Sequence, residues 1–330
     1  MRLTEGNALK NDNNLFAVSA VRVKENSLLS KSDLEQLINA ESYKKAVSLL
    51  SEKGYDINEN SDYSSVLDGE LNETWDYIIS SAPEAAVLKA FVVKNDFQNI
   101  KAILKSEVMG YDAKEYLTQP CITEKDELLE IMSAHSFDSL PDYLGSAAKK
   151  AHEIISTTEN AQLCDAYLDT AALETMLALA KENGDDILCE YFNNYCLACD
   201  IKTAFRAIKT GKDYVFLKTA IADNALISKD DFINAALGGE EEFFSYLSSA
   251  DLADYVQAIE KSASAFEKYC DDKMTKIMKK AKMTVFGISP LAAYYVAKET
   301  EIKCLRIILS AKQSRVSDDI IRERMRELYV

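Results

Sequence analysis

The sequence predicts an all-helical protein, and three observations lead to this fold class. Only ten Gly and four Pro occur in 330 residues, so few positions oppose the growth of long helices. Leu, Ala, Glu and Lys, which favour the helical conformation, are abundant. Apolar residues recur three and four positions apart along most of the chain, which is the spacing of one helix face. Because 48% of the residues are hydrophobic, the chain can bury a substantial core, and a disordered protein is not expected.

The first expected helix lies within residues 15–29, where small and apolar residues form one face. Ser32 followed by Glu35 has the spacing of a capping box and predicts the start of the next helix. Gly54 is expected to end the helix after that, because glycine readily adopts the left-handed conformation at a helix C-terminus. Gly69 is expected to mark a further break.

A long helix is then expected to begin at Pro83 and to end near Gly110. Four turn signals separate the later periodic segments: Gln119–Pro120, Leu140–Pro141, Asp223–Asn224 and Gly238–Gly239. Because these joints are short, we expect one rigid body and not domains on flexible linkers.

Residues 287–330 predict two helices and a short joint. Ser289 is expected to cap the first helix, with Pro290 at its first position, where a missing N–H costs nothing. Ser317 is expected to cap the second helix. The apolar line of that last helix is Ile321, Met325 and Leu328.

Two kinds of marker recur and predict an internal repeat. Corresponding positions of three helical segments hold Asp96, Asp200 and Glu301. An apolar residue, a Ser or Thr and then acidic residues recur four times, at Leu29–Ser30, Ile122–Thr123, Ile227–Ser228 and Val316–Ser317. Each marker alone is an ordinary helix start. Together they predict three diverged copies of one helical unit, at residues 1–122, 123–227 and 228–330.

The charge of the chain excludes several classes of partner. Its 38 Lys and Arg oppose 54 Asp and Glu, which gives a formal net charge of −16. Nucleic acid is not expected to bind, because phosphates require a basic footprint, and anionic lipid is disfavoured for the same reason. No stretch approaches the roughly 18 to 20 apolar residues needed to cross a bilayer. Residues 1–14 are polar and lack a signal-peptide core. We expect a cytoplasmic protein that reaches a membrane only through a partner.

No nucleotide-binding motif stands out. Gly211–Lys212 is the nearest approach to a phosphate-binding loop. However, Arg206 and Asp213 occupy the positions that this motif reserves for Gly and for Ser or Thr. His135 and His152 lack an adjacent nucleophile with a supporting carboxylate, so ordinary surface or core positions are expected for both.

One group of cysteines has a metal-like spacing. Cys196 and Cys199 are separated by two residues, and Cys189 lies seven residues before Cys196. Zinc would need further ligands, so packed core thiols are the preferred interpretation. Neither a metal nor a cofactor is expected.

A lysine cluster is the first candidate for binding a partner. Lys273, Lys276 and Lys280 share one face of an expected helix, with apolar residues interleaved. In so acidic a protein this cluster could dock an acidic partner. The alternative is a solvated helix edge, favoured near the negative C-terminal end of the helix dipole.

Arg322, Arg326 and Tyr329 are the second candidate, because they line one side of the last expected helix. Arg and Tyr are enriched at protein interfaces. The alternative is that these residues keep the helix soluble and pack its end.

Both ends of the chain match the pattern of one known family. The matching stretches are Arg22-Val23-Lys24-Glu25, Pro290-x-x-x-Tyr294, Lys298-Glu299-x-Glu301-Ile302-x-x-Leu305-Arg306-Ile307-Ile308 and Ile321-Arg322-Glu323-Arg324-Met325-Arg326-Glu327-Leu328-Tyr329-Val330. They resemble the C subunits of the A/V-type rotary ATPases, which correspond to the d subunit of the vacuolar enzyme. The resemblance extends over residues 15–330 and is weaker between residues 110 and 184. Cys304 departs from the family, which usually has Asn there.

The resemblance implies a fold and a function. The family fold is an all-helical funnel of three similar lobes around a pseudo-threefold axis. Its role is that of a non-catalytic component of the central rotor, a socket between the membrane proteolipid ring and the central shaft. There it transmits torque between proton or sodium-ion transport and ATP synthesis or hydrolysis. The implied partners are the ring and the shaft proteins, with no nucleotide bound.

Two alternatives from other classes remain open. An open helical-repeat scaffold would grip peptides on a concave face and keep its termini apart. A helical enzyme would have a cleft with convergent carboxylates of strongly perturbed pKa. The socket, in contrast, predicts that the first and last helices lie close together.

Overall fold

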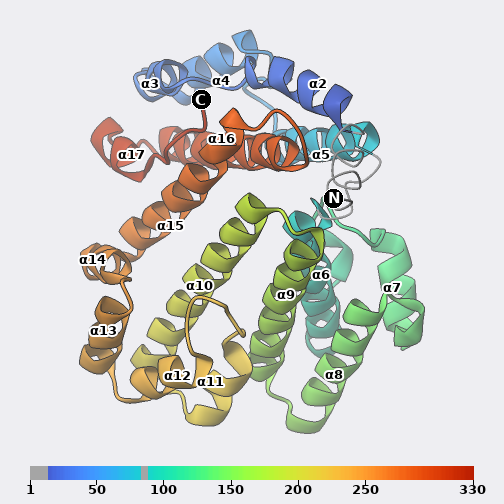
Figure 1. Cartoon of the computed structure of the whole chain (residues 1–330). Coiled ribbons are helices and arrows are strands. Elements are labelled where there is room, and N and C mark those ends of the chain that lie inside the picture. The colour runs from blue at the N-terminus through green and yellow to red at the C-terminus, as the bar shows by residue number, and fades with distance from the viewer. Residues whose placement is uncertain (1–13, 83–87) are drawn as a thin grey trace, which may run out of the picture. The chain divides into compact units, whose positions relative to one another are not determined.

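The computed structural model describes residues 14–82 and 88–330, and these residues form helices and no strand (Figure 1). The prediction of an all-α protein is therefore confirmed. The chain divides into two compact units. The first unit combines Met1–Ala86 with Gln257–Val330, and the second unit is Val87–Val256. The three predicted repeats stay a prediction. The two units are defined by how their residues pack, and packing does not show whether segments arose by duplication.

The first unit is built around one helix, α16 (Ser289–Gln313), whose side chains are all buried from Ser289 to Lys298. The other elements of the first unit are α2 (Leu15–Glu25), α3 (Lys31–Ile38), α4 (Tyr43–Glu52), α5 (Tyr63–Ser81), α15 (Ala263–Met278), the 3₁₀ helix η4 (Lys279–Met283) and α17 (Asp318–Arg324). Each of them packs against α16. The first turns of α16 carry apolar residues on almost every side. This explains why the other elements of the unit can pack around it.

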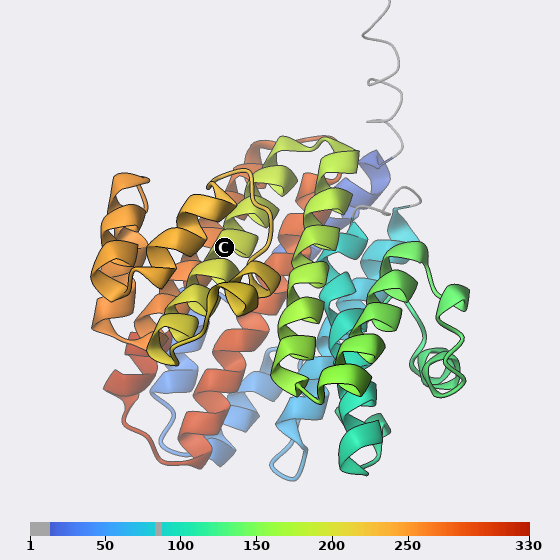
Figure 2. The same ribbon diagram turned by 90° about the horizontal axis from the view of Figure 1, so that it is seen from below.

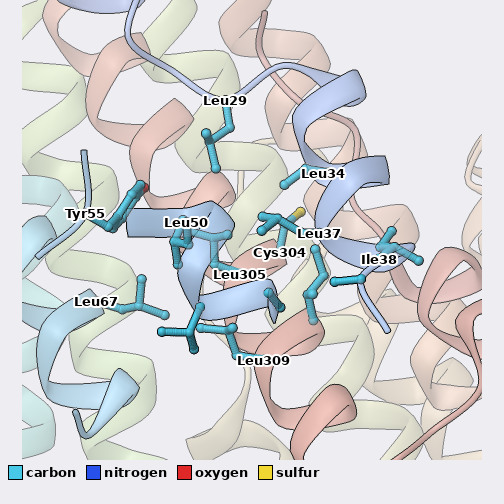
Figure 3. Packing of buried hydrophobic residues seen from close by; sticks show 14 of the residues in the cluster. Leu29, Leu34, Leu37, Ile38, Leu50, Tyr55, Leu67, Cys304, Leu305 and Leu309 are labelled. Atoms are coloured by element: carbon cyan, nitrogen blue, oxygen red, sulfur yellow. The ribbon is translucent and has the colours of Figure 1, made fainter. Parts of the chain in front are cut away.

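The core of the first unit joins residues from both ends of the chain. Figure 3 shows Leu305 and Leu309 of α16 among Leu37 of α3, Leu50 of α4 and Leu67 of α5. Each of these side chains is at most 2% exposed. Burying one leucine completely contributes roughly 1.5–3 kcal/mol, so this cluster is a main source of the stability of the unit.

The first and last described helices lie in the same unit, as the socket hypothesis expects. Helix α2 packs on α16, and α17 packs on α3. Arg22 Nη1 of α2 also lies 3.4 Å from the hydroxyl oxygen of Tyr329. An open scaffold with separated termini does not fit these contacts.

The second unit is built around α9 (Ala161–Asn183). Its packing neighbours are α6 (Lys89–Met109), α8 (Asp142–Thr158), α10 (Asp186–Lys209) and α11 (Tyr214–Ala220). Figure 2 shows α8 and α9 side by side in green and yellow-green. The remaining elements are η2 (Ala113–Tyr116), α7 (Lys125–Ser133), η3 (Phe137–Ser139), α12 (Lys229–Leu237) and α13 (Glu240–Ser249). The boundary between the units falls within α14 (Ala253–Lys261).

Several expected helix boundaries agree with the structure. Gly110 follows α6 with a φ of 74°, in the left-handed region that glycine adopts without strain. Gly54 follows α4 with a φ of 98°. The four predicted joints, from Gln119–Pro120 to Gly238–Gly239, all separate helices. Pro83 lies outside the described residues.

Other boundaries were wrong. The capping box expected at Ser32 is absent, whereas the helix start marked by Leu29–Ser30 is confirmed: the Ser30 hydroxyl accepts the Asp33 N–H, and the Asp33 carboxylate accepts the Ser30 N–H. Gly69 does not break the chain but lies inside α5, where burial of neighbours such as Leu67 offsets the roughly 1 kcal/mol cost of a helical glycine. Ser289 is the first residue of α16 and not its cap, which is Ile288.

The carboxylates chosen as repeat markers share one structural role. Asp96, Asp200 and Glu301 are each at most 1% exposed. Asp96 of α6 accepts the N–H groups of Ile122 and Thr123, at 2.9 and 2.8 Å. Both residues belong to the segment before α7, so the carboxylate fixes the start of a short helix.

The other two carboxylates repeat this arrangement. Asp200 of α10 accepts the Ala222 N–H at 3.1 Å, in the segment before α12. Glu301 of α16 accepts the Leu29 N–H, directly before α3. A buried carboxylate must be hydrogen-bonded, and loop N–H groups with no helical partner supply those bonds.

Candidate partner-binding surface

The three predicted lysines lie at the end of α15 and just beyond it. Lys273 and Lys276 belong to α15, whereas Lys280 belongs to η4, because α15 ends at Met278. The prediction that one continuous helix carries all three is therefore wrong. Lys276 and Lys280 are exposed, and Lys273 is half-buried with its Nζ 6.0 Å from the ring centroid of Tyr269. The interleaved apolar residues Met274, Ile277 and Met278 are buried, which leaves the lysines on the outer side.

Exposed apolar residues continue this basic edge. Met283 is 88%, Val285 61% and Phe286 46% exposed. We call the group of Lys276, Lys280, Lys282, Met283, Val285 and Phe286 the η4 surface. Apolar side chains exposed together beside positive charges are typical of a protein docking site. Sequence reasoning placed Met283 beside the lysines but missed Val285 and Phe286, although the run before Gly287 could have revealed them by its lack of helical periodicity.

Arg22 holds the backbone of the η4 surface in place. Its Nη2 donates to the carbonyl oxygens of Ala281 and Thr284, at 2.6 and 3.0 Å. Its Nη1 forms an ion pair with Glu25 at 2.7 Å. Arg22 therefore connects the turn after α15 to α2. The same guanidinium group is also paired with the Glu25 carboxylate.

Tyr329 supports the same surface from within and is only 2% exposed. Lys282 Nζ lies 4.8 Å from its ring centroid, which is a cation–π distance. Burial, together with the nearby Glu25 carboxylate, raises the pKa of Tyr329 to about 12, although Arg22 opposes this shift. The phenol is therefore neutral at physiological pH. The structure places Tyr329 behind the η4 surface and not on an open helix face.

The two predicted arginines are bound within the first unit. Arg326 Nε donates to Asp271 Oδ2 at 2.9 Å, and the Arg326 side chain is 9% exposed. Arg322 Nε donates to Glu35 Oε2 at 3.1 Å, and its other nitrogens contact Asn39 and Asp319. These contacts tie the C-terminal part of the chain to α15 and α3.

The prediction that one helix carries Arg322, Arg326 and Tyr329 is wrong. Helix α17 ends at Arg324, and residues 325–330 are not helical. We call residues 325–330 the C-terminal strap. Side chains of α15 bind its backbone: Lys268 Nζ donates to the Met325 carbonyl at 2.5 Å, and Asp272 Oδ1 accepts the Glu327 N–H at 2.6 Å. These contacts replace the backbone bonds that a longer helix would have formed.

A sequence model of the ATP synthase (C/AC39) subunit matches residues 17–324, from α2 to the end of α17. The chain belongs to the ATP synthase (C/AC39) subunit family. The resemblance inferred from the two ends of the chain is confirmed.

Members of this family from bacteria and archaea align with nearly the whole chain. The C subunit of the V-type sodium ATPase of Enterococcus hirae is 24% identical, over 94% of this chain and 97% of its own length. The C subunit of the A-type ATP synthase of Methanobrevibacter smithii is 25% identical, over 89% of this chain and 83% of its own. That of Methanocaldococcus jannaschii is also 25% identical, over 93% and 84%.

Two further findings concern membrane-spanning helices and the cysteines of the chain. Among residues 14–82 and 88–330, no helix combines the length and the apolar character that a membrane crossing demands. The cysteines with metal-like spacing all lie on α10, and burial raises the pKa of Cys196 well above its usual value. Cys196 is buried as a packed core thiol would be, whereas Cys189 and Cys199 are half-buried.

Among residues 14–82 and 88–330, the two carboxylates whose pKa is raised, Asp96 and Asp200, lie on separate helices. Burial raises the pKa of Asp200 to about 8 and also raises that of Asp96. These groups lie on different helices, α10 and α6, and each binds the backbone of its own loop. Acid–base catalysis needs such groups to face one substrate, so this pattern does not favour the enzyme alternative.

Proposed function

We propose that this family member is a non-catalytic component of the central rotor in a V/A-type ATPase or ATP synthase. It acts as a socket between the membrane proteolipid ring and the central shaft. The proposal rests on the family match, which extends from α2 to α17 and includes residues of both units. In this role the protein transmits torque between ion transport and ATP synthesis or hydrolysis.

The proposed arrangement is a funnel of three similar helical lobes, with its partners at two ends. The ring and the shaft proteins are the partners, and the protein lies on the cytoplasmic face of the membrane as part of the complex. One relative is named as part of a sodium ATPase and others as part of ATP synthases. The ion that we propose for the complex of this chain is a proton or a sodium ion. No nucleotide or cofactor is required for such a role.

Dense helix packing supports a mechanical function. Helix α16 is buried against every other element of the first unit. Interiors packed to crystalline density transmit strain instead of absorbing it, as a torque-bearing part requires. The contacts of Arg326 and of the C-terminal strap stiffen the surface of the same unit.

The η4 surface is the proposed contact with a partner protein of the rotor. The chain has a net charge of −16, yet Lys276, Lys280 and Lys282 gather here beside exposed apolar side chains. An acidic partner surface with an apolar centre complements this combination. Lys273 is proposed to contribute from the half-buried edge, whereas Arg322, Arg326 and Tyr329 act by holding the surface in place.

Charge reversal tests this assignment. The variant with Lys273→Glu, Lys276→Glu and Lys280→Glu should lower the amount of this chain that co-purifies with the rotary complex at least ~10-fold, which is a binding loss of about 1.4 kcal/mol or more. The Tm of the isolated variant should change little, because the Lys276 and Lys280 side chains are exposed. The matched control is Lys149→Glu with Lys150→Glu, two exposed lysines of α8. Full assembly by the triple variant, or equal loss by the control, contradicts the η4 assignment. Absence of the unmodified chain from the complex contradicts the proposed function itself.

A further inference from the structure

The only two histidines of the chain meet in the second unit. His135 lies just beyond α7, and His152 lies on α8, yet their ring centroids are 4.4 Å apart. Glu107 of α6 completes the group: the ligand atoms of these three side chains all lie within 4.8 Å of one another. We propose that Glu107, His135 and His152 form a binding site for a divalent transition-metal ion of the Zn²⁺ class.

The backbone brings His135 to this position. Helix α7 ends at Ser133, and His135 adopts a φ of 51°, in the left-handed region. Its N–H donates to the Met132 carbonyl at 3.0 Å, which closes the turn. The chain then reverses into η3, and the His135 ring meets that of His152 on α8.

A close approach between η3 and α8 brings the second histidine near the first. A Cβ at Gly145 of α8 would lie 2.3 Å from the Phe137 carbonyl oxygen, so only glycine allows η3 to pack there. His152 lies seven residues further along the same helix, which is two turns and the same face. The glycine contact therefore holds η3 against α8, the helix that carries His152.

Phe137 forms an apolar wall for both rings. It is 8% exposed, and its ring centroid lies 5.8 Å from that of His135 and 5.6 Å from that of His152. Packing of this kind restricts the rotamers of the two imidazoles before any ion binds. The ligands thus come from three elements that already pack together, α6, the turn before η3 and α8.

The donor set indicates the class of ion. Two imidazole nitrogens and one carboxylate oxygen are ligands that zinc prefers, and three protein ligands leave one position for water. Magnesium and calcium require mainly oxygen ligands, so they fit this group poorly. Ligand atoms around tetrahedral zinc are ~3.4 Å apart, given bonds of ~2.0–2.1 Å. Glu107 is exposed, so rotation of its side chain can bring the carboxylate closer to the two imidazoles.

A bound ion would link three helical elements of the second unit. Because the site uses none of the residues of the η4 surface, the inference is independent of the proposed rotor function. Binding of the ion to the folded state should raise the Tm, by an amount that grows with the logarithm of the ratio of ion concentration to Kd.

The test is a titration of the full chain with Zn²⁺, followed by NMR of labelled histidine. With only two imidazoles in the protein, both resonances should shift together and stop shifting at one equivalent. His152→Ala, His135→Asn and Glu107→Gln should each weaken binding at least ~10-fold. Asn is chosen at position 135 because it tolerates the left-handed conformation. Glu153→Gln, beside His152 on α8, is the matched control and should bind as the unmodified chain does.

The seven free cysteines require a second readout. Co²⁺ bound by nitrogen and oxygen lacks the intense sulfur-to-metal charge-transfer band that thiolate ligands produce. We expect the absorption spectrum of the Co²⁺ complex to lack this near-ultraviolet band, and its visible d–d bands to disappear in the His152→Ala variant. Melting curves in a chelator show whether each variant still folds. The proposal is overturned if the imidazole resonances do not respond to Zn²⁺, if the three variants bind normally, or if the Co²⁺ spectrum shows thiolate ligation.

Discussion

At the scale of single residues, three buried carboxylates differ in how many hydrogen bonds they accept. Asp96 accepts two backbone N–H groups, and Glu301 accepts the Tyr55 hydroxyl and the Lys298 ammonium, at 2.5 and 2.9 Å, besides the Leu29 N–H. Asp200 accepts only the Ala222 N–H, and its Oδ2 has no hydrogen-bond partner among the described residues. An ionised Asp200 would be the costliest of the three, because it has the least compensation.

The neutral form of Asp200 makes stability depend on pH. Burial raises the pKa of Asp200 from 3.8 to about 8, so the folded state holds a proton that the unfolded state releases between these values. Stability is therefore greatest at the acid end of this window and falls as pH rises, by about 1.4 kcal/mol per pH unit for this group.

Asp200→Asn should remove this contribution. The free energy of unfolding of this variant should fall less steeply with rising pH than that of the unmodified chain. The two slopes should differ by about 1 kcal/mol per pH unit between roughly pH 5 and pH 7. Urea unfolding at several pH values measures the slope. Asp223→Asn, at an exposed loop position, is the control and should keep the original slope. Equal slopes for Asp200→Asn and the unmodified chain would mean that Asp200 is ionised in the folded protein.

At the scale of elements, the C-terminal strap shows how side chains can end a helix. The apolar spacing of Ile321, Met325 and Leu328 predicted a helix to the end of the chain, but α17 stops at Arg324. The strap instead gains the Asp272 and Lys268 bonds to its backbone and buries Leu328 and Tyr329. Tertiary contacts outweigh local propensity here, since a helix of this length is marginal by itself.

Asp272→Ala should release the strap. The carboxylate accepts the Glu327 N–H and pairs with Lys268 at 2.6 Å, so its loss should lower the free energy of unfolding by about 1–3 kcal/mol. Amide exchange of residues 325–330 should become faster. The control is Asp319→Ala, whose side chain is 96% exposed. Unchanged exchange in the strap would show that Leu328 and Tyr329 hold it without Asp272.

At the scale of the whole molecule, the features that bear on function are the packing of the helices and the exposed η4 surface. Both units are helical, and each has one central helix: α16 packs against every other element of the first unit, and α9 packs against α6, α8, α10 and α11 in the second. The η4 surface offers charge and apolar area but no converging acid and base. The charge and apolar area of this surface are the features on which the proposed rotor contact rests.

The isolated chain should therefore hydrolyse no ATP above the background of the buffer. Phosphate release from a homogeneous preparation measures this directly. Turnover that persists after further purification, and that disappears in Asp200→Asn or Asp96→Asn, would overturn the non-catalytic assignment.

Residue patterns alone predicted the helical class, the helix end at Gly110, the joint at Gln119–Pro120 and the family. These depend on local spacing or on short stretches, which a single chain displays directly. Only the tertiary structure decided that Tyr329 is buried, that α17 ends early and that His135 meets His152. It also decided that Glu301 binds the Leu29 N–H, across 272 residues of sequence. The reason is physical: periodicity assigns a residue to a face of its own helix, whereas its partner depends on how distant segments pack.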